Sequence, residues 1–157
     1  NALRGEKLSD AEWRANIEAA LRELKREYLP RPHAGLDKPM TTPGNRLTVG
    51  CAGPHFALER WRLTSVHRDE AHPTRCLTLS NVNGPVRIVW SGGEESLGPA
   101  ESLLLPAAIG DVEIVPGENG ADLIACYIPN LESDIIAPLR AAGHSDEQIA
   151  ALGEVPI

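Results

Sequence analysis

The sequence has few aromatic side chains and a shortage of positive charge, and both shortages exclude classes of protein. Phenylalanine, tryptophan and tyrosine make up 4% of the 157 residues, so a folded core must be built mainly from leucine, isoleucine, valine and alanine. Acidic residues number 22 against 15 lysines and arginines, which gives a net charge of −7. That charge argues against a general nucleic-acid or anionic-membrane surface, although a local cluster of arginines could still hold an anion.

Long apolar runs and closely paired cysteines are missing too. No segment approaches the roughly 20 apolar residues that span a bilayer, and no basic start leads into an apolar targeting segment. The three cysteines, Cys51, Cys76 and Cys126, are far apart and lie in apolar or strand-like contexts. Such spacing predicts buried free thiols in a reduced, cytoplasmic protein and no zinc knuckle. The first residue is Asn1, so we expect either a processed protein or a piece of a longer one.

Turn-forming residues, in contrast, are abundant, with 14 glycines and 13 prolines. They separate seven short segments, several of which alternate apolar and polar residues: 46–53, 55–66, 74–84, 85–92, 101–107, 111–117 and 121–129. Alternation with a period of two is the pattern of a half-buried strand. Many short strands separated by turns predict a sandwich, jelly roll or small barrel over residues 46–128.

A helical pattern and a proline-rich segment precede this β region. Ser9 and Glu12 match a capping box ahead of an apolar stripe, which predicts an N-terminal helix over 9–28, within the segment 1–29. Residues 30–45 hold four prolines and two glycines. They predict an extended connector without regular secondary structure.

The end of the chain returns to a helical period. Residues 131–157 predict two short helices that pack against the β region. Gly143 is a suitable stop for the first helix, and Ser145 with Gln148 matches a second capping box at the start of the next.

The corner after the fifth strand-like segment raises the question of a metal site. Small β-barrels that bind metal at their mouths often carry Pro-x-Gly-x-x-His at such a corner, and here Pro106, Ala108 and Asp111 occupy those positions. The partner segment of such barrels has His-x-His, then Glu, then Gly. Taking Gly84 as that glycine places Leu77 at the glutamate position, and no His-x-His precedes it. We therefore interpret the corner as structural, with Asp111 facing solvent or capping the turn and the apolar residues in the core: Leu103, Leu105, Val112 and Ile114.

Two histidines suggest a second candidate metal site. His67 and His72 lie in a polar segment, with Asp69 and Glu70 between them. Imidazole and carboxylate groups are common metal ligands. However, His67 and His72 are five residues apart and would lie on opposite faces of any strand, so a solvated loop is the alternative.

Three arginines in the β region form a candidate anion site. Arg60 and Arg62 share one strand face, and with Arg87 nearby they could hold a phosphate or a partner carboxylate. The alternative is scattered surface ion pairs with the many acidic residues. Residues 91–96 place two glycines among acidic neighbours, which predicts a hairpin turn rather than a phosphate-binding loop. Cys76 is predicted to be a buried thiol within a strand and no nucleophile.

The order of these features resembles the C-terminal part of type I mannose-6-phosphate isomerases over residues 46–128. There, a Phe-x-(Leu/Val)-x-x-Trp strand is followed by a strand ending in glycine, a Leu-Leu-Pro-Ala segment and a closing strand. The matching residues are Phe56, Leu58, Trp61, Gly84, Gly98, Glu101, Leu104, Leu105, Pro106 and Ala107. The resemblance implies a cupin fold, so with the helices predicted above we expect a mainly β, cupin-like jelly roll or β-barrel with an N-terminal helix and a short C-terminal helical pair.

That family interconverts mannose 6-phosphate and fructose 6-phosphate; zinc positions the sugar, and proton transfer runs through an enediol. Its zinc ligands, which include a Gln-x-His pair, lie in a first cupin domain. The only glutamine of this chain is Gln148, so that pair is missing here. The resemblance therefore implies a metal-free C-terminal domain with no cofactor and no catalytic residue of its own, which supports an upstream, zinc-containing catalytic domain.

Three hypotheses about function remain open. The first is this supporting domain, whose partners are the upstream domain and a sugar phosphate. The second is a stand-alone, non-catalytic cupin module that binds a sugar, a small ligand or a protein partner. The third is a small metalloenzyme that uses four polar residues: His67, Asp69, Glu70 and His72. By analogy with the pairing of exposed barrel faces in cupins, a homodimer is a further expectation.

Overall fold

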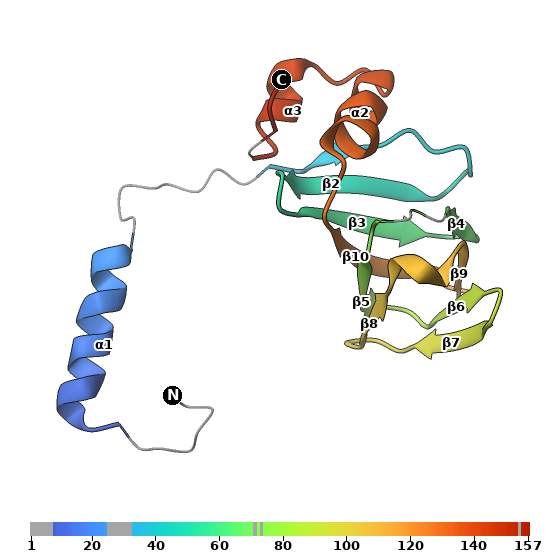
Figure 1. Ribbon diagram of the computed structural model, residues 1–157. Helices are drawn as coiled ribbons and strands as arrows, with labels where there is room; N and C mark the ends of the chain where they lie inside the picture. The colour runs from blue at the N-terminus through green and yellow to red at the C-terminus, as the bar shows by residue number, and fades with distance from the viewer. Residues whose placement is uncertain (1–7, 25–32, 71, 73, 154) are drawn as a thin grey trace. The chain divides into compact units, whose positions relative to one another are not determined.

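The computed structural model describes residues 8–24, 33–70, 72, 74–153 and 155–157 (Figure 1). The chain divides into two compact units, residues 1–32 and 33–157. Among the described residues, no helix has both the length and the apolar character needed to cross a membrane.

The first unit contains helix α1, Asp10–Glu23, which begins where the capping box predicts. The Ser9 hydroxyl accepts a hydrogen bond from the Glu12 amide at 3.3 Å, and the Glu12 carboxylate accepts one from the Ser9 amide at 2.8 Å. The predicted continuation to residue 28 lies outside the described residues. The predicted apolar stripe lies along α1, but none of its residues is buried within this unit.

The second unit is mainly β and contains two antiparallel sheets. The six-stranded sheet has the order β1-β2-β3-β10-β5-β8, with bounds Leu36–Asp37, Arg46–Ala52, Ala57–Leu63, Ala121–Tyr127, Leu77–Asn83 and Ser102–Leu105. The four-stranded sheet has the order β4-β9-β6-β7, with bounds His67–Asp69, Val112–Pro116, Val86–Trp90 and Gly93–Leu97. Each of the seven predicted strand segments contains a strand, which confirms the mainly β expectation.

Three strands, β1, β4 and β7, were not predicted from the sequence. Strand β1 lies within the segment 30–45, so the expectation of a connector without regular structure is wrong at Leu36–Asp37. Strand β4 lies in the segment expected to be a polar loop, and β7 begins inside the expected turn 91–96. All three lie at the edge of a sheet. Edge strands pair on one side only and can be short and polar, and these three lack the apolar alternation that marks a strand.

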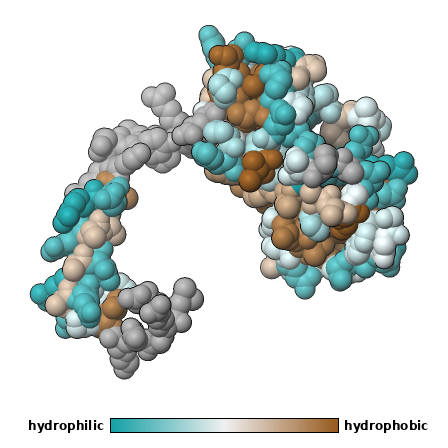
Figure 2. Space-filling view, in the orientation of Figure 1, coloured by the Kyte–Doolittle hydropathy of each residue, from teal (hydrophilic) through white to brown (hydrophobic). Residues whose placement is uncertain are grey.

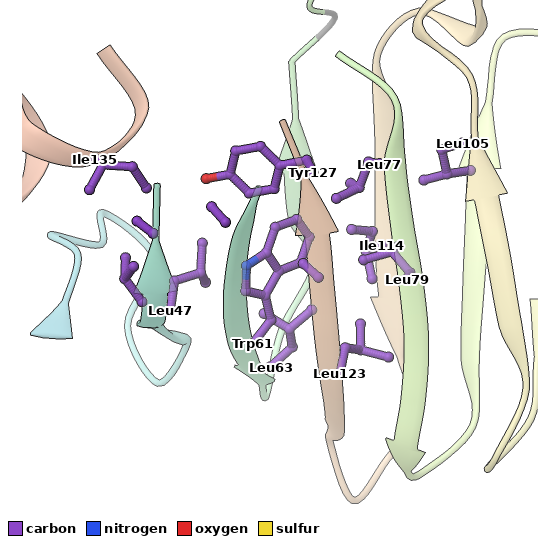
Figure 3. Packing of buried hydrophobic residues seen from close by; sticks show 14 of the residues in the cluster. Leu47, Trp61, Leu63, Leu77, Leu79, Leu105, Ile114, Leu123, Tyr127 and Ile135 are labelled. Atoms are coloured by element: carbon purple, nitrogen blue, oxygen red, sulfur yellow. The ribbon is translucent and has the colours of Figure 1, made fainter. Parts of the chain in front are cut away.

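The core lies between the two sheets and is built from inward-facing side chains (Figure 3). In β3, Ala57, Trp61 and Leu63 are buried and alternate with outward-facing residues. Leu123 of β10 and Ile114 of β9 are fully buried, one from each sheet. The core is mostly aliphatic, as the scarcity of aromatic residues predicts. On the face shown in Figure 2, hydrophobic residues reach the surface only in separate patches, which is usual for a folded domain.

The predicted helical tail is confirmed, and a π-helical segment, η3, precedes its two short helices. Its elements are η3 (Leu131–Ile136), α2 (Ala137–Ala141) and α3 (Asp146–Ala150). Gly143 has a φ of 88° after α2, and the Ser145–Gln148 capping box is present at α3. The tail lies beside β2 (Figure 1), where the Ala52 amide donates a hydrogen bond to the Leu152 carbonyl at 3.1 Å. The buried Ile135, Leu139 and Ile149 extend the core of the barrel unit.

Gly84, between β5 and β6, provides a test of this packing. It has a φ of 84°, and a methyl group there would collide with the backbone carbonyl oxygen of Gly120. Gly110 has a similar φ of 83°, but its methyl group would have no described heavy atom within 4 Å beyond its chain neighbours. We expect Gly84→Ala to lower the free energy of unfolding by more than about 2 kcal/mol and Gly110→Ala by about 1 kcal/mol, measured by urea denaturation. Equal losses would show that backbone strain alone, and not the close approach to Gly120, requires glycine at Gly84.

Candidate functional site

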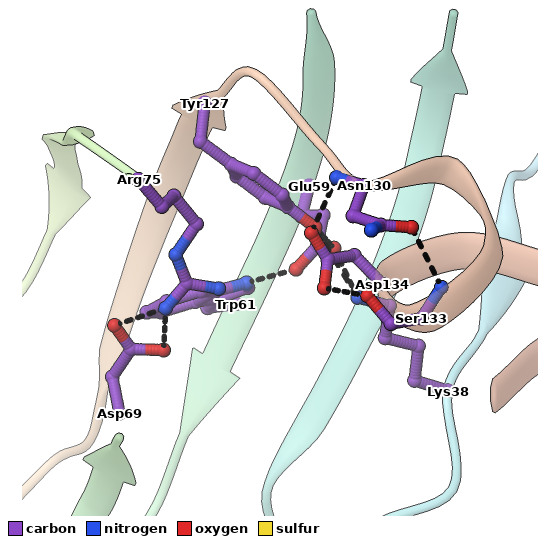
Figure 4. Close-up of polar contacts among 9 residues, drawn as sticks. All are labelled: Lys38, Glu59, Trp61, Asp69, Arg75, Tyr127, Asn130, Ser133 and Asp134. Atoms are coloured by element: carbon purple, nitrogen blue, oxygen red, sulfur yellow. Dashed lines mark hydrogen bonds and ion pairs between the residues drawn. The ribbon is translucent and has the colours of Figure 1, made fainter. Parts of the chain in front are cut away.

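A buried carboxylate is the centre of the polar groups inside the barrel. Glu59 faces inward from β3 and is 1% exposed. It accepts hydrogen bonds from Trp61 Nε1 at 2.7 Å, Lys38 Nζ at 2.5 Å and the Tyr127 hydroxyl at 2.5 Å (Figure 4). Three donors on one carboxylate offset much of the cost of removing its charge from water.

Strand pairing explains how these residues meet. Glu59 and Trp61 are two apart in β3, so both point inward. Tyr127 pairs with Ala57 at the end of β10, which brings its ring alongside. Lys38 follows β1, and its amide donates to the Leu47 carbonyl at 2.9 Å, so the pairing of β1 with β2 holds Lys38 at this end of the barrel.

A second ion pair lies on the other side of Tyr127. Arg75 Nη2 is 2.6 Å from both carboxylate oxygens of Asp69, and its guanidinium lies over the Tyr127 ring at 5.2 Å (Figure 4). Burial and the charge of Glu59 raise the pKa of Tyr127 far above its usual value, so its hydroxyl remains a donor. Tyr127 therefore joins the two ion pairs into one network.

The two histidines of the metal hypothesis take different positions. His67 lies in β4, half-buried, with its ring edge-on to Trp61 at 5.0 Å between centroids. Burial lowers the pKa of His67, although the charges of Asp69 and Glu59 oppose this, so its ring is neutral at pH 7. His72 lies in the loop after β4, where its Nδ1 is 3.3 Å from the Thr74 hydroxyl.

The described residues do not fit a metal site. None of their His, Cys, Asp and Glu side chains gather in a group of three or more that could hold a metal ion. Leu77, at the position where metal-binding barrels have glutamate, is buried among core residues. Asp69 is held by Arg75, and Asp111 is exposed after Gly110. The corner contributes to the core, as expected. Three of its apolar residues are buried, Leu105, Val112 and Ile114, and Leu103 packs against the core.

Two continuous grooves lie at this end of the sheets. The first has a volume of about 530 Å³ and is lined by Arg68, Asp69, Glu70, Val89, Trp90, Ser91, Asp111, Val112 and Glu113. The second, of about 770 Å³, shares Arg68, Glu70 and Glu113 with it and extends to Lys38. Trp90 is half-buried and packs on the core while lining the first groove. Among the described residues that line this groove, four are acidic and one, Arg68, is basic, and Arg68 pairs with Glu113 at 2.9 Å.

The predicted arginine candidates lie outside these grooves. Arg60 and Arg62 do share the outer face of β3, as expected, but Arg87 lies in β6 of the other sheet. Arg60 binds Asp122 through two hydrogen bonds of 2.9 and 2.5 Å. Arg87 pairs with Glu94 at 2.7 Å. The three arginines therefore do not form one site.

The cysteines also differ from expectation. Cys76 is exposed just before β5, and Cys51 and Cys126 are only partly buried, so the prediction of buried thiols is wrong. The physical reason is parity: Cys126 alternates with the inward-facing Ala125 and Tyr127 and thus faces outward. Burial still raises the pKa of Cys126, with a further contribution from Cys51.

Sequence reasoning missed Lys38, Glu59, Trp90 and Tyr127. Glu59 could have been found, because it occupies an inward position between Ala57 and Trp61, where a charge requires partners. Nothing in the local sequence around Lys38 signals its role. Its position depends on the unpredicted strand β1.

The sequence matches no family model and no curated protein. The structure is similar to that of KdgF from Halomonas sp., with a TM-score of 0.51 and 15% identity over 68% of this chain and 93% of that one. It is also similar to the mannose 6-phosphate isomerase from Bacillus subtilis, with a TM-score of 0.53 and 14% identity over 70% of this chain and 33% of the isomerase. At such identities the similarity concerns the fold: residues 33–157 form a cupin-like, mainly β domain.

Proposed function

We propose that this chain is a non-catalytic, cupin-like binding domain that holds a neutral sugar in the groove beside Trp90. The observation that carries the proposal is the composition of that groove, which places a half-buried indole next to carboxylates and Arg68. Small-molecule sites combine an apolar or aromatic surface with a few polar groups that fix orientation. A sugar offers both counterparts, because its C–H face packs on an aromatic ring and its hydroxyls bind charged groups.

The charge of the groove favours a neutral sugar over a sugar phosphate. Asp69, Glu70, Asp111 and Glu113 face it together with Arg68, and Arg75 behind Asp69 adds one more cation. Acidic groups still outnumber basic ones, so a phosphate would meet net repulsion.

The polar groups inside the barrel support a role without turnover. A general acid or base must reach the proton that it transfers. Glu59 is 1% exposed, and its oxygens are occupied by Lys38, Trp61 and Tyr127. Arg75 and Asp69 likewise bind each other. Glu59 therefore faces no substrate, and Asp69, which does line the groove, is held by Arg75.

The second candidate is a supporting domain of a mannose-6-phosphate isomerase-like protein. Its support is the residue pattern from Phe56 to Ala107 together with the alignment to a third of the Bacillus subtilis isomerase. In that case an upstream domain would hold zinc and perform the isomerisation, and this chain would pack beside it. Both candidates expect no isomerase activity from this chain alone, and turnover of mannose 6-phosphate by it would contradict both.

An NMR titration with mannose, glucose and mannose 6-phosphate tests the sugar proposal. We expect saturable amide shifts around Trp90 with the neutral sugars and weaker ones with mannose 6-phosphate. Trp90→Ala should weaken binding about tenfold, because it removes the aromatic surface. Trp13→Ala, in α1, is the matched control and should leave the affinity unchanged. Absence of saturable shifts with both neutral sugars, or unchanged affinity in Trp90→Ala, would exclude this groove as a sugar site. Preference for mannose 6-phosphate would favour the isomerase-like candidate.

A further inference from the structure

Three arginines gather on the outer face of the six-stranded sheet, away from the sugar groove. Arg62 in β3 lies opposite Arg46 in β2 and opposite Asp122 in β10. Arg60 follows two residues earlier on the same face of β3. Arg46 Nε is 2.6 Å from Asp37, and Arg60 binds Asp122 at 2.5 Å. Among these five described residues, three arginines and two aspartates leave one positive charge, on a chain whose net charge is −7.

Arg62 carries that charge. Among the described residues it has no ion pair, and its Nε is buried without a hydrogen-bond partner. Its field still reaches its neighbours: the hydrogen bond from Arg60 lowers the pKa of Asp122, and the charge of Arg62 adds to that effect. The outer face therefore holds a guanidinium that makes no hydrogen bond or ion pair with the described part of the domain.

This arrangement is costly unless something binds there. A buried N–H without an acceptor is unfavourable, and native structures contain few of them. The direct opposition of Arg46 and Arg62 across two strands adds like-charge repulsion. The buried Nε is out of reach of an incoming group, but a carboxylate placed over the half-buried guanidinium of Arg62 would separate the two cations electrostatically.

We propose that Arg62, flanked by Arg46 and Arg60, recognises an extended acidic segment of a protein partner. The face already binds carboxylates in this manner, since Asp37 and Asp122 each hold one of the flanking arginines. Arg60 and Arg62 are two residues apart on a strand, about 7 Å, which is also the spacing of alternate side chains in an extended peptide. Acidic residues at alternate positions of such a peptide would therefore reach both arginines.

The test is fluorescence anisotropy of the full chain with a labelled peptide of alternating threonine and glutamate. A peptide with glutamine in place of glutamate is the matched probe. We expect the glutamate peptide to bind, with affinity falling as salt rises, and the glutamine peptide not to bind. Arg62→Gln should weaken binding about fivefold or more. Arg87→Gln removes the same charge from an arginine of the other sheet and should have no effect.

Two further measurements test whether Arg62 itself contacts the peptide. Arg62→Lys keeps the charge but lacks the forked guanidinium donors, so it should also weaken binding, and it replaces Arg62→Gln if that variant fails to fold. The Nε–H resonance of Arg62 should shift in the wild-type titration. Equal losses in Arg62→Gln and Arg87→Gln would show a non-specific charge effect and overturn the proposal. Competition by inorganic phosphate at the same concentration as glutamate peptide would overturn it as well, because the face would then be a small-anion site.

Discussion

Replacing Glu59 by alanine should lower the free energy of unfolding by about 3–5 kcal/mol. The carboxylate is 1% exposed and accepts hydrogen bonds from Lys38, Trp61 and Tyr127. Its removal leaves a buried indole N–H and a buried hydroxyl without acceptors, and it leaves the Lys38 ammonium, 15% exposed, without its counter-charge. Each of these groups then bears the cost of having left water, which is larger than the net value of the bonds themselves.

Urea denaturation followed by circular dichroism measures this loss. Glu94→Ala is the matched control, because Glu94 pairs with Arg87 at the surface, with 57% of its side chain exposed, and little change is expected. Glu59→Gln should fall between the two, since the amide oxygen still accepts one of the three hydrogen bonds while the charge is lost. A loss below about 1 kcal/mol in Glu59→Ala would show that this network stabilises the barrel no more than an ordinary surface ion pair does.

Leu123→Ala should lower the free energy of unfolding by about 3 kcal/mol. Leu123 is fully buried in β10, which lies between β3 and β5 in the six-stranded sheet. Truncation removes buried methyl groups and leaves a cavity that two neighbouring strands hold open. The surrounding core can relax only in part, so the cost exceeds the transfer free energy alone.

The matched control is the next residue of the same strand. Ile124 faces outward and is only partly buried, so Ile124→Ala should cost much less than Leu123→Ala in the same denaturation experiment. The two variants share a strand, a hydrogen-bonding pattern and similar side-chain volumes, and they differ in the side of the sheet that they face. A larger loss in Ile124→Ala would show that β10 has the opposite register from the one described.

The strands that could be predicted from the sequence are those with one apolar face and one polar face. In β3, buried Ala57, Trp61 and Leu63 alternate with outward Arg60 and Arg62, and this contrast is visible in the sequence. In β7, only Leu97 is buried. An edge strand is held by backbone pairing with one neighbour, and its side chains need not alternate. This is why β1, β4 and β7 were missed.

The partners of Glu59 in the candidate site could not be predicted from the sequence either. An acidic residue at an inward position of β3 predicts that partners exist, but it does not say which. Lys38 is 21 residues before Glu59 in the chain, and Tyr127 is 68 residues after it. These contacts arise because β1 pairs with β2 and β10 pairs with β3.

The sequence by itself determined the starts of the helices at Ser9 and Ser145, the inward and outward faces of the long strands, and the lack of His-x-His and Gln-x-His patterns. These properties depend on neighbours within about four positions, where capping and parity act. Only the tertiary structure decided that Lys38 meets Glu59, that Arg87 lies on a different sheet from Arg62, and that Trp90 lines a groove. The physical reason is that strand order sets which distant residues become neighbours, and strand order depends on how both sheets bury their faces against a shared core.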